Sequence, residues 1–409
     1  MTDTPAPVTA PPTQRKAWIA GLEGPRGVAA ICVVLAHVAV VHTPNIVAST
    51  RIDFLGQALT FFFALSGFLL YLPYVTRFAD GAAFPNTKRY FVARVRRVFP
   101  AYIVIFLIVN FVLGAGYVVN PVTSGWDHSA DGTGTITAPL PLLAHLTLTQ
   151  SYFPSTLQTG INPSWSLSTE WGFYLVLPIA GFLLFRFGRG GRRPLVTALI
   201  PAVALIALGL IANTIVGRLQ HASGLPPLEQ YWGPNWVAVF SRSFLALADH
   251  FAWGMVAAVV YAAIARGAFS RLSTSRLSAV LLSIAVLALS GSMLLFALGS
   301  RYISSVFAIA SCASILAIVA PLGRGEDSRL ARMTDWAPLK YLGMVSLSSY
   351  LWHYPVLVLV GRAGIPIPPT ALGLVWGFVL VMSLTVALGS LTYYLVERPM
   401  MRWRAGRTT

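Results

Sequence analysis

Long apolar stretches separated by short polar loops run along almost the whole chain. The hydrocarbon core of a membrane is about 30 Å thick, so a helix that crosses it needs roughly 17 to 25 mostly apolar residues. Ten stretches meet this requirement, at residues 27–43, 55–76, 98–119, 164–186, 195–217, 237–265, 277–298, 302–321, 341–361 and 371–396. The pattern therefore predicts an all-α fold, a polytopic transmembrane bundle of about ten helices.

Basic residues divide unevenly between the loops on the two sides of this bundle. The chain has 29 Lys and Arg against 13 Asp and Glu. If the amino terminus is cytoplasmic, the opposite side receives only five basic residues, Arg51, Arg218, Arg242, Arg301 and Arg362. Because cytoplasmic loops carry the excess of Lys and Arg, this division places both termini in the cytoplasm. The net charge of +16 then belongs to one membrane face, and a nucleic-acid partner is not expected.

Three regions follow from these patterns. Residues 1–24 are rich in Pro, Thr and Ala and are expected to form a disordered cytoplasmic tail. Residues 25–400 form the membrane domain, and residues 401–409 a basic cytoplasmic tail. The only cysteines, Cys32 and Cys312, lie in apolar stretches, which excludes a disulfide-stapled secreted fold and a cysteine-rich metal site.

Two loops on the far side of the membrane carry unusual apolar or aromatic content. The loop of residues 120–163 is the longest, and its apolar segment 140–153 is too short to span. That length suits an interfacial or re-entrant helix that covers the bundle as a lid. The loop of residues 218–236 is rich in Tyr and Trp, which fits an interfacial belt, although such rings can also hold a sugar.

Ionisable residues inside the expected spans indicate function, because each is costly to insert. At 1.5 Å per residue, His37 lies roughly 16 Å along its helix from Arg26, near the middle of the membrane. Four helices bring such residues to the central and outer layers, namely His37, Glu170, Asp249 with His250, and His353. Each could instead make a structural hydrogen bond between helices.

The chemistry that fits this set best is general base catalysis. A neutral His next to a carboxylate that fixes its tautomer is a common base for a hydroxyl. A metal site is not expected, since no helix carries a His-x-x-x-His or Glu-x-x-His spacing. Ser166 and Ser168 beside Glu170 leave an acyl-serine route open. The chain has no Gly-x-Ser-x-Gly elbow, so direct transfer is preferred.

Basic residues on the cytoplasmic side have two interpretations. Arg94 and Arg97 are three residues apart and share a helical face where the third span enters the membrane. Together with Arg26 they could grip phosphates, a task for which Arg is better suited than Lys. Contact with anionic lipid explains them equally well.

Six segments in order resemble the motifs of the acyltransferase 3 family, polytopic membrane O-acyltransferases. They are Arg26-Gly-Val-Ala-Ala-Ile-Cys-Val-Val-Leu-Ala-His37, Phe61-Phe-Phe-Ala-Leu-Ser-Gly-Phe-Leu-Leu70, Arg94-x-x-Arg97-x-x-Pro100-Ala-Tyr102, Trp165-Ser-Leu-Ser-Thr-Glu170-x-x-Phe-Tyr174, Ser348-Ser-Tyr-Leu-Trp-His353-Tyr-Pro355 and Tyr393-Tyr-Leu-Val-Glu397-Arg-Pro399. Together they cover nearly the whole chain, and their joint occurrence is highly specific.

The resemblance implies a ten-helix enzyme that takes an acyl group, expected to be acetyl, from cytoplasmic acyl-CoA. It would deliver this group to a hydroxyl of an envelope glycolipid or polysaccharide precursor at the outer leaflet of a bacterial plasma membrane. Acyl-CoA is then a substrate, and no permanently bound cofactor is expected. Some family members carry a hydrolase-like domain after the bundle, so this chain, which stops at Thr409, is expected to act alone or with a separate partner.

The resemblance also implies roles for individual residues. Arg26, Arg94 and Arg97 would face the CoA phosphates, and His37 would be the catalytic base. Glu170 would orient His37 or the acceptor, with His353 a further candidate for the same pocket. Weaker candidates for binding the acceptor are Trp165, Asp249 and His250. No family motif is evident at Asp249 and His250, whose role stays open between acceptor binding and helix packing.

A transporter or flippase of a lipid-linked or anionic substrate is the competing class of function. It would also place polar residues at mid-membrane depth and basic residues on the inner face. Transporters commonly show two-fold repeats with interrupted helices. No such repeat is visible in the sequence, which favours the enzyme.

Overall fold

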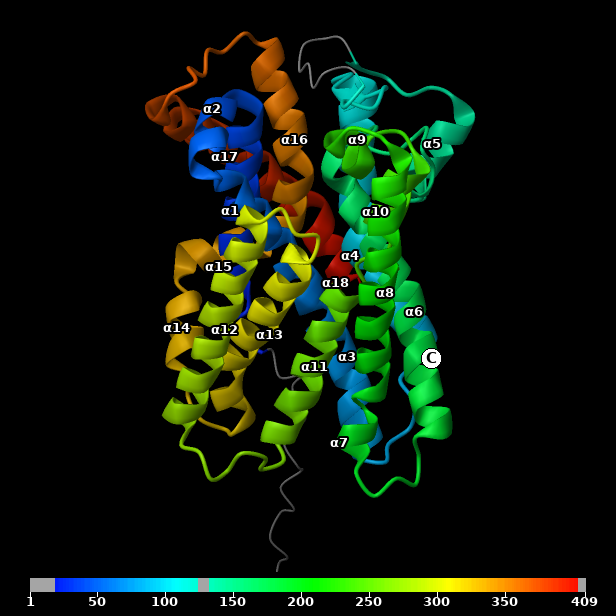
Figure 1. The fold of residues 1–409 in the computed structure, drawn as a ribbon, viewed down its shortest axis with the longest axis vertical. Helices are drawn as coiled ribbons and strands as arrows, with labels where there is room; N and C mark the ends of the chain where they lie inside the picture. Colours follow the sequence, from blue (N-terminus) through cyan, green and yellow to red (C-terminus); the bar gives the residue numbers. More distant parts are fainter. Residues whose placement is uncertain (1–18, 124–131, 404–409) are drawn as a thin grey trace, which may run out of the picture.

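The protein is a helical bundle whose main helices run roughly along one axis (Figure 1). The computed structural model describes residues 19–123 and 132–403. The main helices are α1 (Glu23–His42), α3 (Leu59–Ala79), α4 (Thr87–Leu107), α6 (Trp165–Phe187), α8 (Ile200–Ser223), α11 (Ala248–Ile264), α12 (Thr274–Ala297), α13 (Ile303–Gly323), α16 (Ser346–Arg362) and α17 (Ala371–Thr392). Within these described residues, eight segments are long and apolar enough to cross a membrane, or nine if a bent pair counts as one span. The all-α polytopic fold is therefore confirmed.

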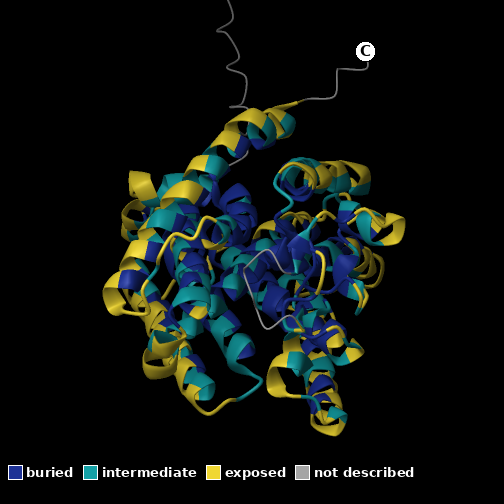
Figure 2. Cartoon of the chain, turned by 90° about the horizontal axis from the view of Figure 1, so that it is seen from above, coloured by how far each residue is buried: buried dark blue, intermediate teal, exposed yellow. Residues whose placement is uncertain are grey.

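Shorter elements join the main helices. The helical ones are α2 (Pro44–Thr50), η1 (Ile52–Ala58), η2 (Ile108–Val112), α5 (Pro139–Leu146), η3 (Gln150–Tyr152), η4 (Asn162–Ser164), α7 (Pro194–Thr197), α9 (Pro227–Trp232), α10 (Trp236–Arg242), α14 (Arg329–Thr334), α15 (Ala337–Met344), η5 (Tyr393–Glu397) and α18 (Arg398–Arg402). Strands β1 (Gly116–Tyr117) and β2 (Thr133–Gly134) form a small antiparallel pair. Figure 2 shows buried positions concentrated in the middle of the bundle and exposed positions around its circumference.

Two of the expected spans are interrupted. The span expected at 237–265 divides into α10 and the 17-residue α11, because the backbone becomes extended at Ser243. The span expected at 341–361 begins within α15, which meets α16 at an angle of 75°. The bend lies at Val345, and Gly343 just before it is in close contact with α1, since a Cβ there would lie 1.9 Å from the backbone oxygen of Glu23. The glycine lets α15 pack directly on the start of α1.

The ends of the chain fall only in part within the described residues. Residues 1–18 of the expected first tail and residues 404–409 of the expected basic tail lie outside them. Helix α1 begins at Glu23, so the helical region starts slightly before the expected boundary. At the other end, α18 continues the helical structure through Arg402.

The long loop expected at residues 120–163 packs onto the end of α4. A hydrogen bond from Arg362 links it to α16. Helix α5 occupies part of the apolar segment expected to be interfacial, and its Leu140 and Leu143 are exposed. Burial lowers the pKa of His145 in α5 to about 4, so this ring stays neutral, and its Nε2 pairs with the hydroxyl of Thr159. Arg362 at the end of α16 donates to backbone oxygens of Leu113 and Gly114 and to the hydroxyl of Thr133. These bonds fix the position of the helix that carries His353.

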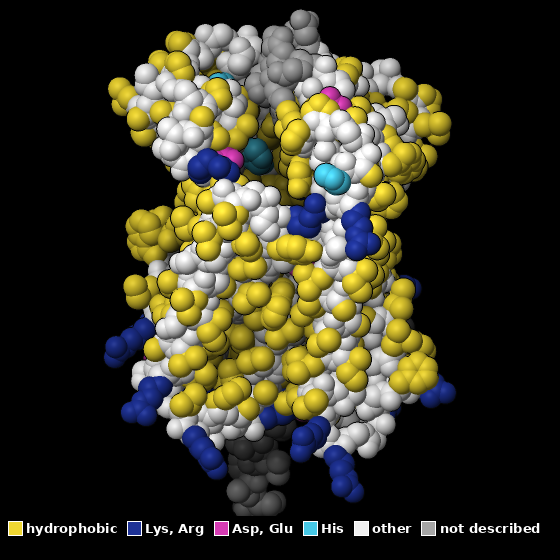
Figure 3. All heavy atoms as spheres, in the orientation of Figure 1, with side chains coloured by type: hydrophobic (Ala, Val, Ile, Leu, Met, Phe, Trp, Pro, Cys, Tyr) yellow, Lys and Arg dark blue, Asp and Glu magenta, His cyan; other side chains and the backbone are white. Residues whose placement is uncertain are grey.

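Basic side chains gather around the lower rim of the face in Figure 3, below a broad apolar surface. This arrangement agrees with the division of charge in the sequence, from which the positive-inside rule predicts that the lower rim faces the cytoplasm. The upper half of the same face is hollowed, with a histidine side chain visible inside (Figure 3).

The orientation can be tested with single cysteines in a chain whose Cys32 and Cys312 are replaced by Ala. Ser49 in α2 and Ser275 in α12 are exposed at opposite ends of the bundle. We expect Ser49→Cys to react with a membrane-impermeant maleimide on intact cells and Ser275→Cys to react only after permeabilisation. The reverse pattern of labelling would overturn the assigned orientation.

Candidate active site

Close packing of α3 against α11 positions the first polar side chain of the site. A Cβ at Gly67 would lie 2.0 Å from the Phe251 oxygen, so these two helices make backbone contact that only glycine permits. Ser66, the preceding residue, is thereby directed toward α6. Its hydroxyl donates a 2.5 Å hydrogen bond to Oε1 of Glu170.

A cavity of about 440 Å³ opens beside this hydrogen bond. Its polar wall contains Glu23, Arg26, Ser66, Arg94, Arg97, Ser166, Glu170, Tyr174, Ser346, Tyr350 and Tyr393, and Phe62, Leu65 and Leu69 belong to its apolar wall. The volume is that of a small-molecule site. The structure thus brings together in one cavity Arg26, Arg94, Arg97 and Glu170, which the sequence expected to serve one reaction.

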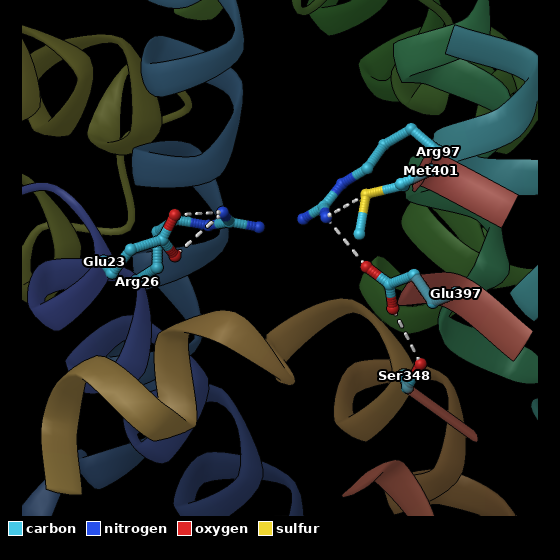
Figure 4. Close-up of polar contacts among 6 residues, drawn as sticks. All are labelled: Glu23, Arg26, Arg97, Ser348, Glu397 and Met401. Carbon is cyan, nitrogen blue, oxygen red and sulfur yellow. Dashed lines mark hydrogen bonds and ion pairs between the residues drawn. The ribbon is translucent and has the colours of Figure 1, made fainter. Parts of the chain in front are cut away.

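Each of two cavity arginines is paired with a carboxylate. Arg26 bonds Glu23 one helical turn before it, at 3.1 Å. Arg97 makes an ion pair of 2.8 Å with Glu397, whose side chain is buried and also accepts a hydrogen bond from Ser348. Figure 4 shows the two guanidinium groups pointing toward one another from opposite sides of the site. The carboxylates hold the two cations at fixed positions, close enough for one polyanion to contact both.

Arg94 is bound less completely than its neighbours. Its Nε is buried without a hydrogen-bond partner among the described residues, and its guanidinium lies 5.9 Å from the centre of the Tyr174 ring. Arg96 points elsewhere, as the helical spacing predicts, and bonds the backbone oxygen of Trp403. The α4 face that carries Arg94 and Arg97 therefore has unused hydrogen-bonding capacity for an anionic ligand.

His37 and His353 form a hydrogen-bonded pair. Nε2 of His353 lies 3.0 Å from Nδ1 of His37, and Nδ1 of His353 contacts the backbone oxygen of Tyr350. A carbonyl oxygen can only accept, so Nδ1 of His353 donates; in the neutral ring Nε2 of His353 then accepts from Nδ1 of His37. This leaves Nε2 of His37 without a proton. His353 is fully buried, whereas His37 is only partly buried, so the basic nitrogen belongs to the more accessible ring.

Tyr350 connects the histidine pair with the arginine-lined cavity. Its backbone oxygen binds His353, while its side chain lines the cavity. The phenol oxygen lies 2.8 Å from Oγ of Ser166 and donates to the backbone oxygen of Pro163. One residue therefore contacts α6, the cavity and the second histidine.

Glu170 occupies a different place from the one expected for a residue that orients His37. It accepts from Ser66 and is also hydrogen-bonded to Tyr174, and it lies in the wall of the arginine cavity. The group that fixes the tautomer of His37 is the neutral His353. The sequence could not show whether Glu170 or His353 orients His37, because both lie near mid-membrane depth and the sequence does not show which helices are neighbours.

The weaker acceptor candidates do not line the cavity. Asp249 is fully buried at the start of α11, and a Cβ at Gly209 of α8 would lie 2.7 Å from its Oδ1. His250 stacks on the ring of Phe63, with 6.3 Å between ring centres. Nε2 of His250 lies 3.8 Å from Oδ1 of Asp249, whose carboxylate oxygens have no hydrogen-bond partner among the described residues. Trp165 lies at the outer end of α6, against Trp232 and Arg242.

Ser166 and Ser168 are both buried at the start of α6. Ser166 bonds Tyr350 and the Pro163 oxygen, and Ser168 accepts from the hydroxyl of Ser151. Neither serine has a hydrogen bond to a histidine within the described ranges. This arrangement lacks the activated serine that an acyl-serine route requires. Over residues 19–123 and 132–403, no group of three or more His, Cys, Asp or Glu could hold a metal ion.

The structure places in the site several residues to which the sequence alone gave no role. Ser66, Tyr350 and Glu397 lie inside segments that match family motifs, and that membership was their only signal. Glu397 also closes the π-helical turn η5, a distortion that is frequent at functional sites. The sequence alone does not reveal a π-helical turn.

A polytopic helical bundle with an arginine-lined cavity next to a histidine pair has the parts expected of a membrane acyltransferase. The family Acyl_transf_3, described as an acyltransferase domain, matches residues 19–394. The chain therefore belongs to this family. Membership of this family favours an acyltransferase over the transporter alternative.

Curated relatives include proteins named as acyltransferases or O-acetyltransferases. The peptidoglycan O-acetyltransferase OatA of Listeria monocytogenes is 25% identical over 94% of this chain and 56% of its own length. The putative peptidoglycan O-acetyltransferase YrhL of Bacillus subtilis is 25% identical over 95% and 55%. The acyltransferase MdmB of Streptomyces mycarofaciens is 27% identical over 87% and 83%. The chain thus spans about half the length of the first two relatives. No solved structure matches it.

Proposed function

We propose that the protein transfers an acyl group, in the first instance acetyl, from acyl-CoA to a hydroxyl of a saccharide acceptor. The acceptor is a glycolipid or a polymer of the bacterial cell envelope, and the enzyme resides in the plasma membrane. The observation that carries the proposal is the arrangement around Tyr350. Cationic groups suited to CoA phosphates lie in the cavity, and Tyr350 in its wall is connected through His353 to His37, the proposed base.

The reaction follows from these positions. The thioester enters the cavity with its phosphates near Arg26, Arg94 and Arg97, and the acceptor hydroxyl approaches Nε2 of His37. This nitrogen takes the hydroxyl proton as the oxygen attacks the thioester carbonyl. The C–S bond then breaks, and the CoA sulfur leaves as a thiolate that receives the proton from His37. The products are an ester and free CoA thiol.

Purified protein in lipid nanodiscs provides the direct test. It is incubated with radiolabelled acetyl-CoA and a panel of saccharides and glycolipids, and both CoA release and the label on the acceptor are measured. We expect CoA release to depend on an acceptor and to equal the label transferred. Absence of both with every acceptor, in protein that binds acetyl-CoA, would contradict the proposed reaction.

His353 is expected to position His37 and not to contact the substrate. His353→Ala should lower kcat by roughly tenfold or more, within the range of a misplaced base, with little change in the KM for acetyl-CoA. His353→Gln should restore part of kcat, because an amide oxygen can accept from Nδ1 of His37. Equal activities of the Ala and Gln variants would argue against this role.

A further inference from the structure

Arg242 lies in a cluster of aromatic rings that the proposed reaction does not use. Its guanidinium carbon is 3.4 Å from the ring centre of Trp232, 4.9 Å from that of Trp165 and 5.8 Å from that of Tyr231. We call these four residues the aromatic–arginine cluster. It joins α9 and α10, in the upper part of Figure 1, to the first residue of α6.

The charge of Arg242 has no ionic partner among the described residues. No carboxylate lies within salt-bridge distance of it, and its Nε donates only to the backbone oxygen of Tyr231. Packing against aromatic faces compensates the charge only in part. A partly buried cation without a counter-ion is costly to maintain, so an anionic ligand would stabilise it. Arg is also the side chain best suited to bind a carboxylate or phosphate in two-point fashion.

The cluster is fixed to the helix that carries Glu170. The hydroxyl of Thr169 donates to the backbone oxygen of Arg242, and the side-chain amide of Asn120 donates to that of Trp232. Trp165 immediately precedes Ser166, which lines the arginine cavity. The cluster is therefore linked to the cavity wall through consecutive residues of α6.

We propose that the aromatic–arginine cluster is a binding site for an acidic saccharide, in which Arg242 binds a carboxylate or phosphate and an aromatic ring packs on the sugar. Tyr231 is exposed and offers the accessible ring. A saccharide is favoured over a lipid headgroup because the guanidinium lies among rings that suit the flat face of a sugar. The inference rests on the proposed function, since it assigns a charged group to the acceptor.

The test compares two probes that differ in charge. One is a tetrasaccharide of alternating N-acetylglucosamine and N-acetylmuramic acid, and the other is a tetramer of N-acetylglucosamine, which lacks the lactyl carboxylates. Binding is measured by calorimetry without acyl-CoA, in nanodiscs of neutral phosphatidylcholine. We expect the wild type to bind the acidic probe about tenfold or more tightly than the neutral one, as a charge-assisted hydrogen bond implies.

Matched variants decide whether Arg242 causes the preference for the acidic probe. Arg242→Gln should abolish the preference for the acidic probe, and Arg218→Gln, at an exposed arginine outside the cluster, should keep it. Tyr231→Leu should weaken both probes. If Arg242→Gln does not fold, as judged by its thermal unfolding, the wild-type preference and the Tyr231→Leu result still decide the question.

Three results would overturn the inference. The first is equal affinity of the wild type for both probes, and the second is an unchanged preference in Arg242→Gln. The third is competition by phosphatidylglycerol, seen in the wild type and lost in Arg242→Gln, without binding of the acidic saccharide. That third result would assign the cluster to a lipid headgroup. The binding test contains no acyl-CoA, so its result does not depend on acyl transfer. Loss of saccharide binding by the cluster and loss of acyl transfer can therefore be told apart.

Discussion

His37→Ala should lower the rate of acyl transfer by roughly 10² to 10⁴ while leaving the affinity for acyl-CoA nearly unchanged. The reason is that an alcohol at neutral pH needs a base to accept its proton during attack on the thioester. Nε2 of His37 is the nitrogen that the hydrogen bonds to His353 and Tyr350 leave without a proton. Turnover, acyl-CoA affinity and thermal stability should be measured on one preparation.

If His37 has a purely structural role, the expected result is different. Loss of one hydrogen bond between helices costs about 1 kcal/mol of stability and leaves turnover of the folded protein near normal. His145→Ala is the matched control, because His145 is also buried and hydrogen-bonded, to Thr159, but lies outside the site. We expect His145→Ala to lower stability without a comparable loss of turnover. Near-normal turnover in His37→Ala would remove it as the base.

Local spacing explains why part of the site could be predicted from the sequence. Arg94 and Arg97 share a helical face because residues three apart lie on one side of a helix, and the structure places both in the cavity. The apolar stretches likewise predicted the helical bundle, since spanning length is a property of each segment alone. Such features need no knowledge of which helices are neighbours.

Contacts between distant helices could not be predicted in this way. His37 and His353 are 316 residues apart, and no periodicity indicates that their rings meet. The partner of Arg97 is Glu397, on a π-helical turn that sequence patterns do not reveal. The close packing of α15 against α1 also depends on a glycine whose importance only the assembled structure shows.

The second large effect concerns acyl-CoA binding by the paired arginines. Arg94→Ala should weaken binding by about 1.5 to 3 kcal/mol, a factor of roughly 10 to 150, which is the usual contribution of a hydrogen bond to a charged group. Arg94 gives the cleaner result because no carboxylate pairs with it among the described residues. Affinity is measured by calorimetry with acetyl-CoA in nanodiscs.

The binding test of Arg97 requires a compensating substitution at Glu397. Removing it alone leaves the buried Glu397 without its ion-pair partner, and an uncompensated buried charge costs about 3 to 5 kcal/mol of stability. Arg97→Ala combined with Glu397→Gln removes that charge, so the remaining loss of affinity reports on the ligand. Arg96→Ala, on another face of α4, should bind acetyl-CoA as the wild type does. Unchanged affinity in a variant that combines Arg94→Ala, Arg97→Ala and Glu397→Gln would assign these arginines to lipid contact, because CoA phosphates held by them could not tolerate the loss of both cations.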